Sequence, residues 1–176
     1  MLLIIFARLN GGLTMNIREL RNMFPALSRT VYDRQLVYFD NAATAQRSQS
    51  VIDKWTQLTI GANANIHRAV HKLAVDATDE YESTRDAVKE YINAAAREEI
   101  VFTSGTTGSI NLVAFSFGET FVNKGDEIIV SETEHHSNIV PWQMLCQRKG
   151  AVLRVLHVDE DGHLNLEELK SLLNPK

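Results

Sequence analysis

The turn SGTT, residues 104–107, has residue types that could bind a phosphate group. It lies in VFTSGTTGSIN, residues 101–111, where a short apolar run meets the start of a helical pattern. The first backbone N–H groups of a helix have no partner within the helix, and the helix dipole attracts anions there. Gly105 allows close approach of the backbone, and the hydroxyls of Thr106 and Thr107 add donors. Because Ser and Thr are favoured at helix starts regardless of function, a plain helix cap stays open as the alternative.

The residues after the turn argue against a nucleotide as the source of the phosphate. A Walker A loop needs a lysine after its last glycine, whereas Gly108 is followed by Ser109. Enzymes that adenylate carboxylic acids carry a similar TSGTTG loop and continue it with proline and lysine. This chain continues with Ser109, Ile110 and Asn111, so that likeness stops at the sixth residue.

The histidines do not indicate a metal site. His135 and His136 lie in EHHSNIVPW, residues 134–142, and an isolated pair of histidines is more often exposed or a helix cap than catalytic. Adjacent histidines point apart, so His135 and His136 do not form a metal site. His67 and His71 have the spacing of a zinc-binding helix face but lack the glutamate of H-E-x-x-H. We therefore predict no metal site.

Alternating strands and helices are predicted to position these residues. The C-terminal half indicates a βαβαβ arrangement, in which helices of about a dozen residues separate short apolar strands. Such an order is typical of a parallel sheet with right-handed crossovers. The predicted strands are 99–103, 127–130 and 152–158, and the predicted helices are 107–117 and 139–149.

The N-terminal half is predicted to be less regular. A strand at 36–40 precedes helices at 51–60 and 76–94, and a final helix after the turn at 161–162 is capped by Asn165. Three acidic residues are expected in the first turn of the helix at 76–94, where the dipole favours anions. They are Asp76, Asp79 and Glu80.

Composition indicates an ordinary globular protein that does not bind nucleic acid. The 176 residues are 44% hydrophobic with a formal net charge of -4, and the charges are interspersed. The single cysteine, Cys146, excludes an internal disulfide framework, fits a cytoplasmic location, and is predicted to pack as a small apolar residue. Residues 1–14 contain an apolar run of about six residues, too short for a membrane anchor, and read as an extension or a mis-chosen start before Met15.

Four motifs in order carry a resemblance to a known family. They are YFDNAAT at 38–44, NIHRAVH at 65–71, EIVFTSGTTGSIN at 99–111 and EHHSNIVPW at 134–142. With them the chain, from about Met15 onward, resembles class V aminotransferases, and more narrowly the Suf-type (group II) cysteine desulfurases. One departure is Gly108, where that family commonly carries a glutamate.

The resemblance implies a fold and a cofactor. The fold is α/β, a truncated part of the fold type I of transferases dependent on pyridoxal 5'-phosphate (PLP), with a mostly parallel sheet and flanking helices. Residues 15–60 would be an N-terminal arm and helix, and residues 61–176 the first half of the large PLP-binding domain.

It also implies roles for single residues. Thr106 and Thr107 would hold the PLP phosphate, and His135 would stack on the pyridine ring and exchange protons with substrate, which makes it both cofactor-binding and catalytic. The turn that contains Ala42 and Ala43, together with His71, would line the substrate pocket.

The implied activity is the conversion of L-cysteine to L-alanine with transfer of sulfur to an enzyme thiolate as a persulfide. A homodimer and a sulfur-acceptor protein of iron–sulfur cluster assembly would be its partners. The Schiff-base lysine and the nucleophilic cysteine are expected C-terminal to this segment, and no lysine here lies in such a motif. We therefore expect an N-terminal part that is inactive by itself. Another class V PLP enzyme, such as a selenocysteine lyase, and an inactive truncated product remain alternatives.

Overall fold

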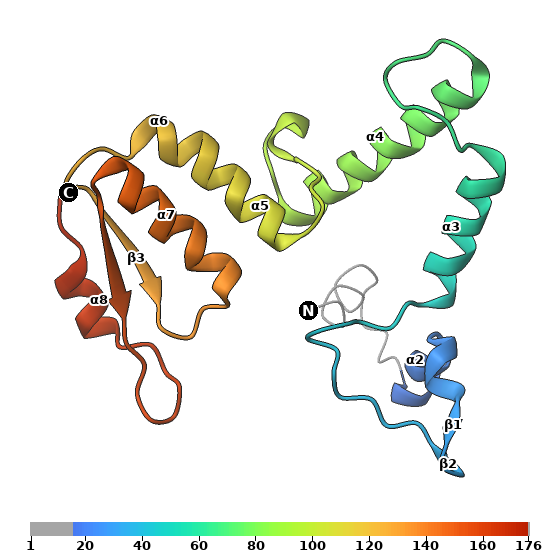
Figure 1. The fold of residues 1–176 in the computed structure, drawn as a ribbon. Coiled ribbons are helices and arrows are strands. Elements are labelled where there is room, and N and C mark those ends of the chain that lie inside the picture. The colour runs from blue at the N-terminus through green and yellow to red at the C-terminus, as the bar shows by residue number, and fades with distance from the viewer. Residues whose placement is uncertain (1–15, 176) are drawn as a thin grey trace. The chain divides into compact units, whose positions relative to one another are not determined.

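The computed structural model describes residues 16–175, drawn as a coloured ribbon in Figure 1. The chain divides after Ile100 into two units, Met1–Ile100 and Val101–Lys176. The described part of the first unit is mostly helical, and the second contains a parallel pair of strands.

The first unit begins with a short helix and a tight hairpin. Asn16 caps α2 (Ile17–Asn22), and a 3₁₀ turn, η1 (Pro25–Ser28), leads into β1 (Thr30–Val31) and β2 (Arg34–Gln35). The two strands pair antiparallel. Tyr32 and Asp33 between them both have positive φ, at 52° and 58°, as a two-residue hairpin turn requires.

The predicted strand at 36–40 is wrong. These residues have no regular structure, because the hairpin pairs the residues just before them and no strand lies beside them within the described chain. Of the side chains that suggested a strand, Val37 and Phe39 are exposed, and Phe39 keeps 92% of its surface accessible. A β-rich segment without a neighbouring strand cannot form the ladder of backbone hydrogen bonds that defines a strand.

Two longer helices follow in this unit. The prediction of a helix at 51–60 is confirmed by α3 (Gln49–Gly61). The second, α4 (Lys72–Ile92), starts one turn earlier than predicted, because the Nδ1 atom of His71 accepts the N–H of Ala74 at 3.3 Å and caps the helix. The acidic residues expected in its first turn therefore lie farther along the helix. They are Asp76, Asp79 and Glu80.

The predicted strand at 99–103 is also wrong. A 3₁₀ turn, η2 (Arg97–Glu99), comes first, and residues 100–103 have no regular structure. The Arg85 guanidinium donates to the carbonyl of Ile100, so a side chain takes the place of a neighbouring strand. Ile100 is nevertheless buried, with 5% of its surface exposed, which explains the apolar character of this segment.

The second unit starts with a continuous helical run. It consists of α5 (Thr106–Val113), a π-helical segment, η3 (Ala114–Gly118), and α6 (Glu119–Phe121). The helix predicted at 107–117 is confirmed and continues by one more turn. Gly118 approaches the later helix α7 (Val140–Lys149) so closely that a Cβ there would lie 2.4 Å from Cδ2 of Leu145.

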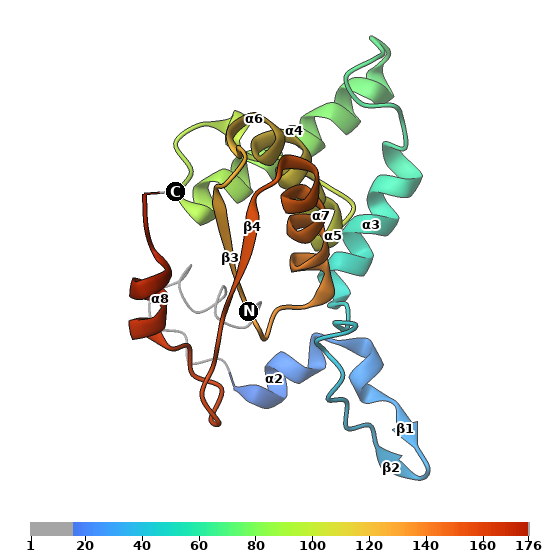
Figure 2. The ribbon, with the colours of Figure 1, turned by 60° about the vertical axis from the view of Figure 1, so that its left-hand side comes forward.

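A parallel pair of strands forms the sheet of this unit. β3 (Glu127–Ser131) pairs with β4 (Val152–Leu156), and α7 (Val140–Lys149) connects them, which confirms the predicted parallel arrangement. α8 (Leu166–Leu172) begins at Asn165, whose side chain accepts the N–H of Glu168 as predicted. Both views show α7 and α8 on opposite sides of the strand pair (Figures 1 and 2).

The core of the second unit lies between the helices and the strand pair. Cys146 packs there as predicted, and burial raises the pKa of its thiol. Leu145 beside it is fully buried. The other buried apolar residues of this unit are Ala114, Val130 and Leu156.

The contact between α8 and β4 should depend on pH through His157 and Glu168. The Nδ1 atom of the His157 ring lies 2.7 Å from one carboxylate oxygen of Glu168. The other carboxylate oxygen accepts the backbone N–H of His157 at 3.1 Å. This hydrogen bond raises the pKa of His157 above 6.5, helped by the charges of Glu168 and Glu132, and lowers the pKa of Glu168 below 4.5. The stabilisation of the fold that comes from His157 is full below pH 6.5 and is lost as the pH rises through the raised pKa of His157. The stabilisation that comes from Glu168 is full above pH 4.5 and is lost as the pH falls through the lowered pKa of Glu168.

We therefore expect the pair to stabilise the fold most between about pH 4.5 and 6.5. Thermal unfolding of the chain and of His157→Gln should differ most in that window and converge above and below it. His136→Gln, which removes a histidine that has no carboxylate partner within the described residues, is the control. A difference that does not change with pH would contradict the prediction.

Candidate functional site

The predicted phosphate turn is held open by its own side chains. Gly105 caps α5 with φ 131° and ψ 177°, a conformation that is strained for any residue with a Cβ. The Thr103 hydroxyl donates to the Gly105 carbonyl at 3.1 Å and lies 2.6 Å from the Ser109 hydroxyl. Thr103 and Ser109, which were not predicted from the sequence, fix the turn without occupying its open side.

The open side of the turn presents unpaired backbone N–H groups and two hydroxyls that can donate. Within residues 16–175, the N–H groups of Thr106, Thr107 and Gly108 have no acceptor, and neither threonine hydroxyl has a partner. Both threonines are exposed, and α5 carries no charged side chain. A phosphate offers only acceptor oxygens and negative charge, so it fits this arrangement of donors.

Gly108, the departure from the family pattern, has little free space. A Cβ at this position would lie 3.0 Å from Oγ of Ser104. A glutamate there would require Ser104 to shift, whereas the backbone N–H groups of the turn would stay in place. The departure therefore affects Ser104 and not the donors that face the open side.

His135 is oriented by the residue two positions after it. It caps a 3₁₀ turn, η4 (His136–Asn138), and its Nδ1 atom accepts the Ser137 N–H at 3.1 Å. The Ser137 hydroxyl lies 2.9 Å from the same nitrogen. Nε2 makes no hydrogen bond within the described chain, and the ring is exposed. Ser137 was not predicted from the sequence, although a cap that accepts from the second residue of a helix is a recognisable spacing.

Other residues of this motif stabilise the turn by hydrogen bonds between side chains. Asn138 donates to the Glu134 carboxylate at 2.9 Å and accepts from the Trp142 indole N–H at 2.9 Å. These i to i+4 contacts tie the residues before η4 to the start of α7. The motif thus combines a capping histidine with a hydrogen-bonded row of side chains.

The structure brings the predicted cofactor residues of the second unit toward one another. α5, which begins with Thr106 and Thr107, packs against η4, which His135 caps. His135 also follows shortly after the carboxyl end of β3 at Ser131. In open α/β sheets, ligands bind outside the carboxyl ends of the strands, so this position is consistent with a cofactor site.

The predicted substrate residues belong to the first unit. Ala42 and Ala43 lie in an exposed turn, which is closed by the Tyr38 hydroxyl donating to the carbonyls of Asp40 and Thr44 at 3.1 and 2.9 Å. His71 caps α4 and is also exposed. Their place in a substrate pocket stays a prediction.

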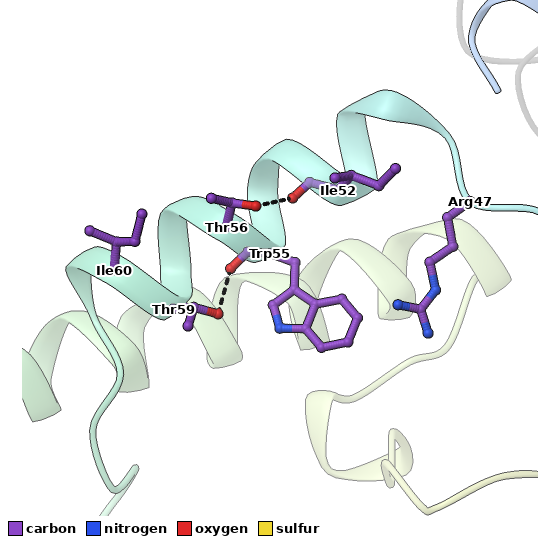
Figure 3. Close-up of a pocket in the computed structure, with 6 residues that line it drawn as sticks. All are labelled: Arg47, Ile52, Trp55, Thr56, Thr59 and Ile60. Carbon is purple, nitrogen blue, oxygen red and sulfur yellow. Dashed lines mark hydrogen bonds between the residues drawn. The ribbon is translucent and has the colours of Figure 1, made fainter. Parts of the chain in front are cut away.

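A shallow hollow on α3 is a poor alternative site. Figure 3 shows Arg47 beside Trp55, with the guanidinium 4.6 Å from the centre of the ring. The hydroxyls of Thr56 and Thr59 both donate to carbonyls of α3 itself, at 2.9 and 2.8 Å. They are therefore satisfied within the helix, and the hollow offers no group of converging donors.

Two further findings concern only the described part of the chain. Between residues 16 and 175, no three or more His, Cys, Asp or Glu side chains gather where they could hold a metal ion. In the same region, no helix has both the length and the apolar character needed to cross a membrane.

A parallel βαβ unit, a helix start with N–H groups that are free within the described chain and a nearby histidine are an arrangement that α/β domains use to bind cofactors. Comparison with known proteins gives the particular family. Residues 37–176 match the model of Aminotransferase class-V, and the chain belongs to this family.

Three similar proteins are described as cysteine desulfurases. A cysteine desulfurase of Synechococcus elongatus is 48% identical over 166 residues, which are 94% of this chain and 26% of that protein. A probable cysteine desulfurase of Staphylococcus aureus strain Mu50 is 45% identical over 163 residues, which are 93% of this chain and 40% of that protein. The crystal structure of the Escherichia coli cysteine desulfurase CsdA superposes with a TM-score of 0.73 at 36% identity, over 92% of this chain and 39% of that one. The chain thus spans about a quarter to two-fifths of the length of these relatives.

Proposed function

We propose that this chain provides the phosphate-binding turn and the ring-facing histidine of a PLP-dependent cysteine desulfurase of the Suf type. The observation that carries the proposal is the turn at Thr106 and Thr107, whose backbone N–H groups have no acceptor in the described chain and which packs against the segment that His135 caps. The similarity to cysteine desulfurases supports the choice of reaction. The substrate would be L-cysteine, and the products L-alanine and sulfur held as an enzyme persulfide for iron–sulfur cluster assembly.

The roles of the residues follow from their hydrogen-bonding capacity. Thr106 and Thr107 would donate to the phosphate from both backbone and hydroxyl groups, and the start of α5 would favour its charge. His135 would lie over the ring and move a proton between Nε2 and the substrate. Bound PLP supplies an electron sink for negative charge on the substrate carbon.

Other parts of the proposal depend on the resemblance. Ala42, Ala43 and His71 would line the substrate pocket, and residues 61–176 would be the first half of the large domain. The whole enzyme would be a homodimer in the cytoplasm and would pass its sulfur to an acceptor protein. The persulfide would form on a cysteine other than Cys146, because Cys146 is buried and burial raises the pKa of its thiol.

The test uses a chimaera in which residues 16–175 replace the matching segment of the Staphylococcus aureus relative. We expect the chimaera to bind PLP and to form alanine from L-cysteine. A chimaera that folds but binds no PLP, or that binds PLP and forms no alanine, would contradict the proposal.

Thr107→Ala in the chimaera should weaken PLP binding while leaving turnover largely intact at saturating PLP. The substitution removes one hydroxyl donor to a charged oxygen, worth about 1.5–3 kcal/mol, and leaves the backbone donors in place. The dissociation constant should therefore rise roughly ten- to a hundredfold, measured by fluorescence titration. Thr120→Ala is the matched control, because its hydroxyl donates within the helical run to the Ser116 carbonyl at 2.8 Å. Equal affinity of Thr107→Ala and the parent would contradict the phosphate role.

The chain by itself should form no stable Schiff base with PLP. Several of its lysines are engaged in exposed ion pairs, including Lys54 with Glu80 at 2.8 Å and Lys170 with Glu167 at 2.7 Å. After addition of PLP, borohydride reduction and proteolysis, we expect only scattered low labelling in mass spectra, with the whole Staphylococcus aureus relative as positive control. Stoichiometric label on one lysine would show that this chain carries a site of its own.

A further inference from the structure

The contact between Ser137 and His135 determines which ring nitrogen can carry a proton. The Ser137 N–H is only a donor, and it points at Nδ1 of His135 from 3.1 Å. The neutral ring in this arrangement therefore has its lone pair on Nδ1 and its proton on Nε2. The Ser137 hydroxyl, 2.9 Å from the same Nδ1, can either donate or accept.

Proton exchange with a substrate requires the other pattern. An imidazole that gives a proton from Nε2 and takes it back must keep a proton on Nδ1 throughout, since otherwise the ring would become an anion. When the doubly protonated ring gives up the Nε2 proton, the N–H electron pair stays on Nε2 and the remaining proton lies on Nδ1. That Nδ1–H needs an acceptor, and the structure offers the Ser137 hydroxyl there.

We propose that Ser137 is a positioning residue that switches His135 between two hydrogen-bond patterns. In the resting pattern the Ser137 N–H donates to Nδ1 and the ring is a helix cap. In the reactive pattern Nδ1–H donates to the Ser137 hydroxyl, and Nε2 is free to exchange a proton. This inference rests on the proposed function for its catalytic meaning, but the two patterns belong to the chain itself.

The surroundings contain few other groups that could replace Ser137. The neighbouring titratable side chains are Glu134, which is bonded to the Asn138 amide, and His136, whose ring centre is 6.1 Å from that of His135. α5, which packs against η4, carries no charged side chain. On α7, which also packs against η4, Arg148 and Lys149 lie in the last turn.

Magic-angle-spinning ¹⁵N spectra of the full chain, labelled at histidine, read the protonation of each ring nitrogen. His135→Asn identifies the His135 signals. In alkaline samples we expect the parent ring to carry its proton on Nε2. At the pH where half of the parent rings carry both protons, Ser137→Ala should reduce that share to below roughly a tenth, as loss of one hydrogen bond to the charged ring implies. Ser137→Thr keeps the hydroxyl and should match the parent.

Two results would overturn the inference. A neutral parent ring with its proton on Nδ1 would contradict the resting pattern, and unchanged double protonation in Ser137→Ala would contradict the role of the hydroxyl. In the chimaera, Ser137→Ala should lower turnover roughly three- to tenfold at unchanged PLP occupancy, and Ser137→Thr should restore it. If the parent chimaera forms no alanine, the proposed function fails, while the spectra of the chain still decide the inference separately.

Discussion

His135→Asn in the chimaera should lower alanine formation by about 10²–10⁴-fold while most of the PLP stays bound. Asparagine is among the best helix caps, so it can replace the contact between Nδ1 and the Ser137 N–H that begins η4. It cannot exchange protons as an imidazole does. The expected loss is therefore the contribution of a general acid–base group and not of a lost cap.

The measurement compares alanine production with PLP occupancy at saturating L-cysteine. His136→Asn is the matched control, because it changes the same residue type one position away, and it should retain roughly the parent rate to within the few-fold effect of a surface change. If His135→Asn turned over at the parent rate with full occupancy, His135 would be only a cap.

Leu145→Ala should lower the free energy of unfolding of the chain by about 2–5 kcal/mol, the usual cost of removing a buried leucine side chain. Leu145 is fully buried, and Gly118 lies so close to it that the helical run cannot supply a side chain to fill the space. Leu173→Ala, which truncates a leucine with 63% of its surface exposed, should stay within about 0.5 kcal/mol of the parent.

Urea unfolding followed by circular dichroism measures both variants under the same conditions. A cost below about 1 kcal/mol for Leu145→Ala would mean that the site collapses around the smaller residue. The stability of the second unit would then depend less on α7 than the burial of Leu145 suggests.

Local patterns in the sequence predicted the elements of the second unit well. The helical run from Thr106, β3, α7, β4 and the cap at Asn165 all follow from short-range periodicity and capping residues. The resemblance to class V aminotransferases is likewise confirmed by the match over residues 37–176, while the narrower Suf-type resemblance stays a prediction. These features depend on neighbours in the chain, which a sequence displays directly.

The incorrect predictions concern interactions that a local pattern does not show. The segments at 36–40 and 99–103 have the composition of strands, but a strand also needs a partner, and neither has one in the described chain. The start of α4 was missed because histidine is not among the preferred capping residues. Ser137 was missed for a related reason, because the role of a serine in a short turn depends on how the neighbouring His135 ring is oriented.

The π-helical segment η3 makes the length of this helical run adjustable by a single residue. A π turn holds one residue more than the α-helix around it, so deleting one residue within Ala114–Gly118 would restore regular α-helix. Because this wider turn takes up the extra residue within itself, the helix on either side keeps its direction. Glu119, just after the segment, therefore stays on the face where it pairs with Arg148 at 2.7 Å. Sequences that are one residue shorter here should retain this ion pair where both charges are retained, because an alignment gap within these five residues removes the bulge and not the helix face.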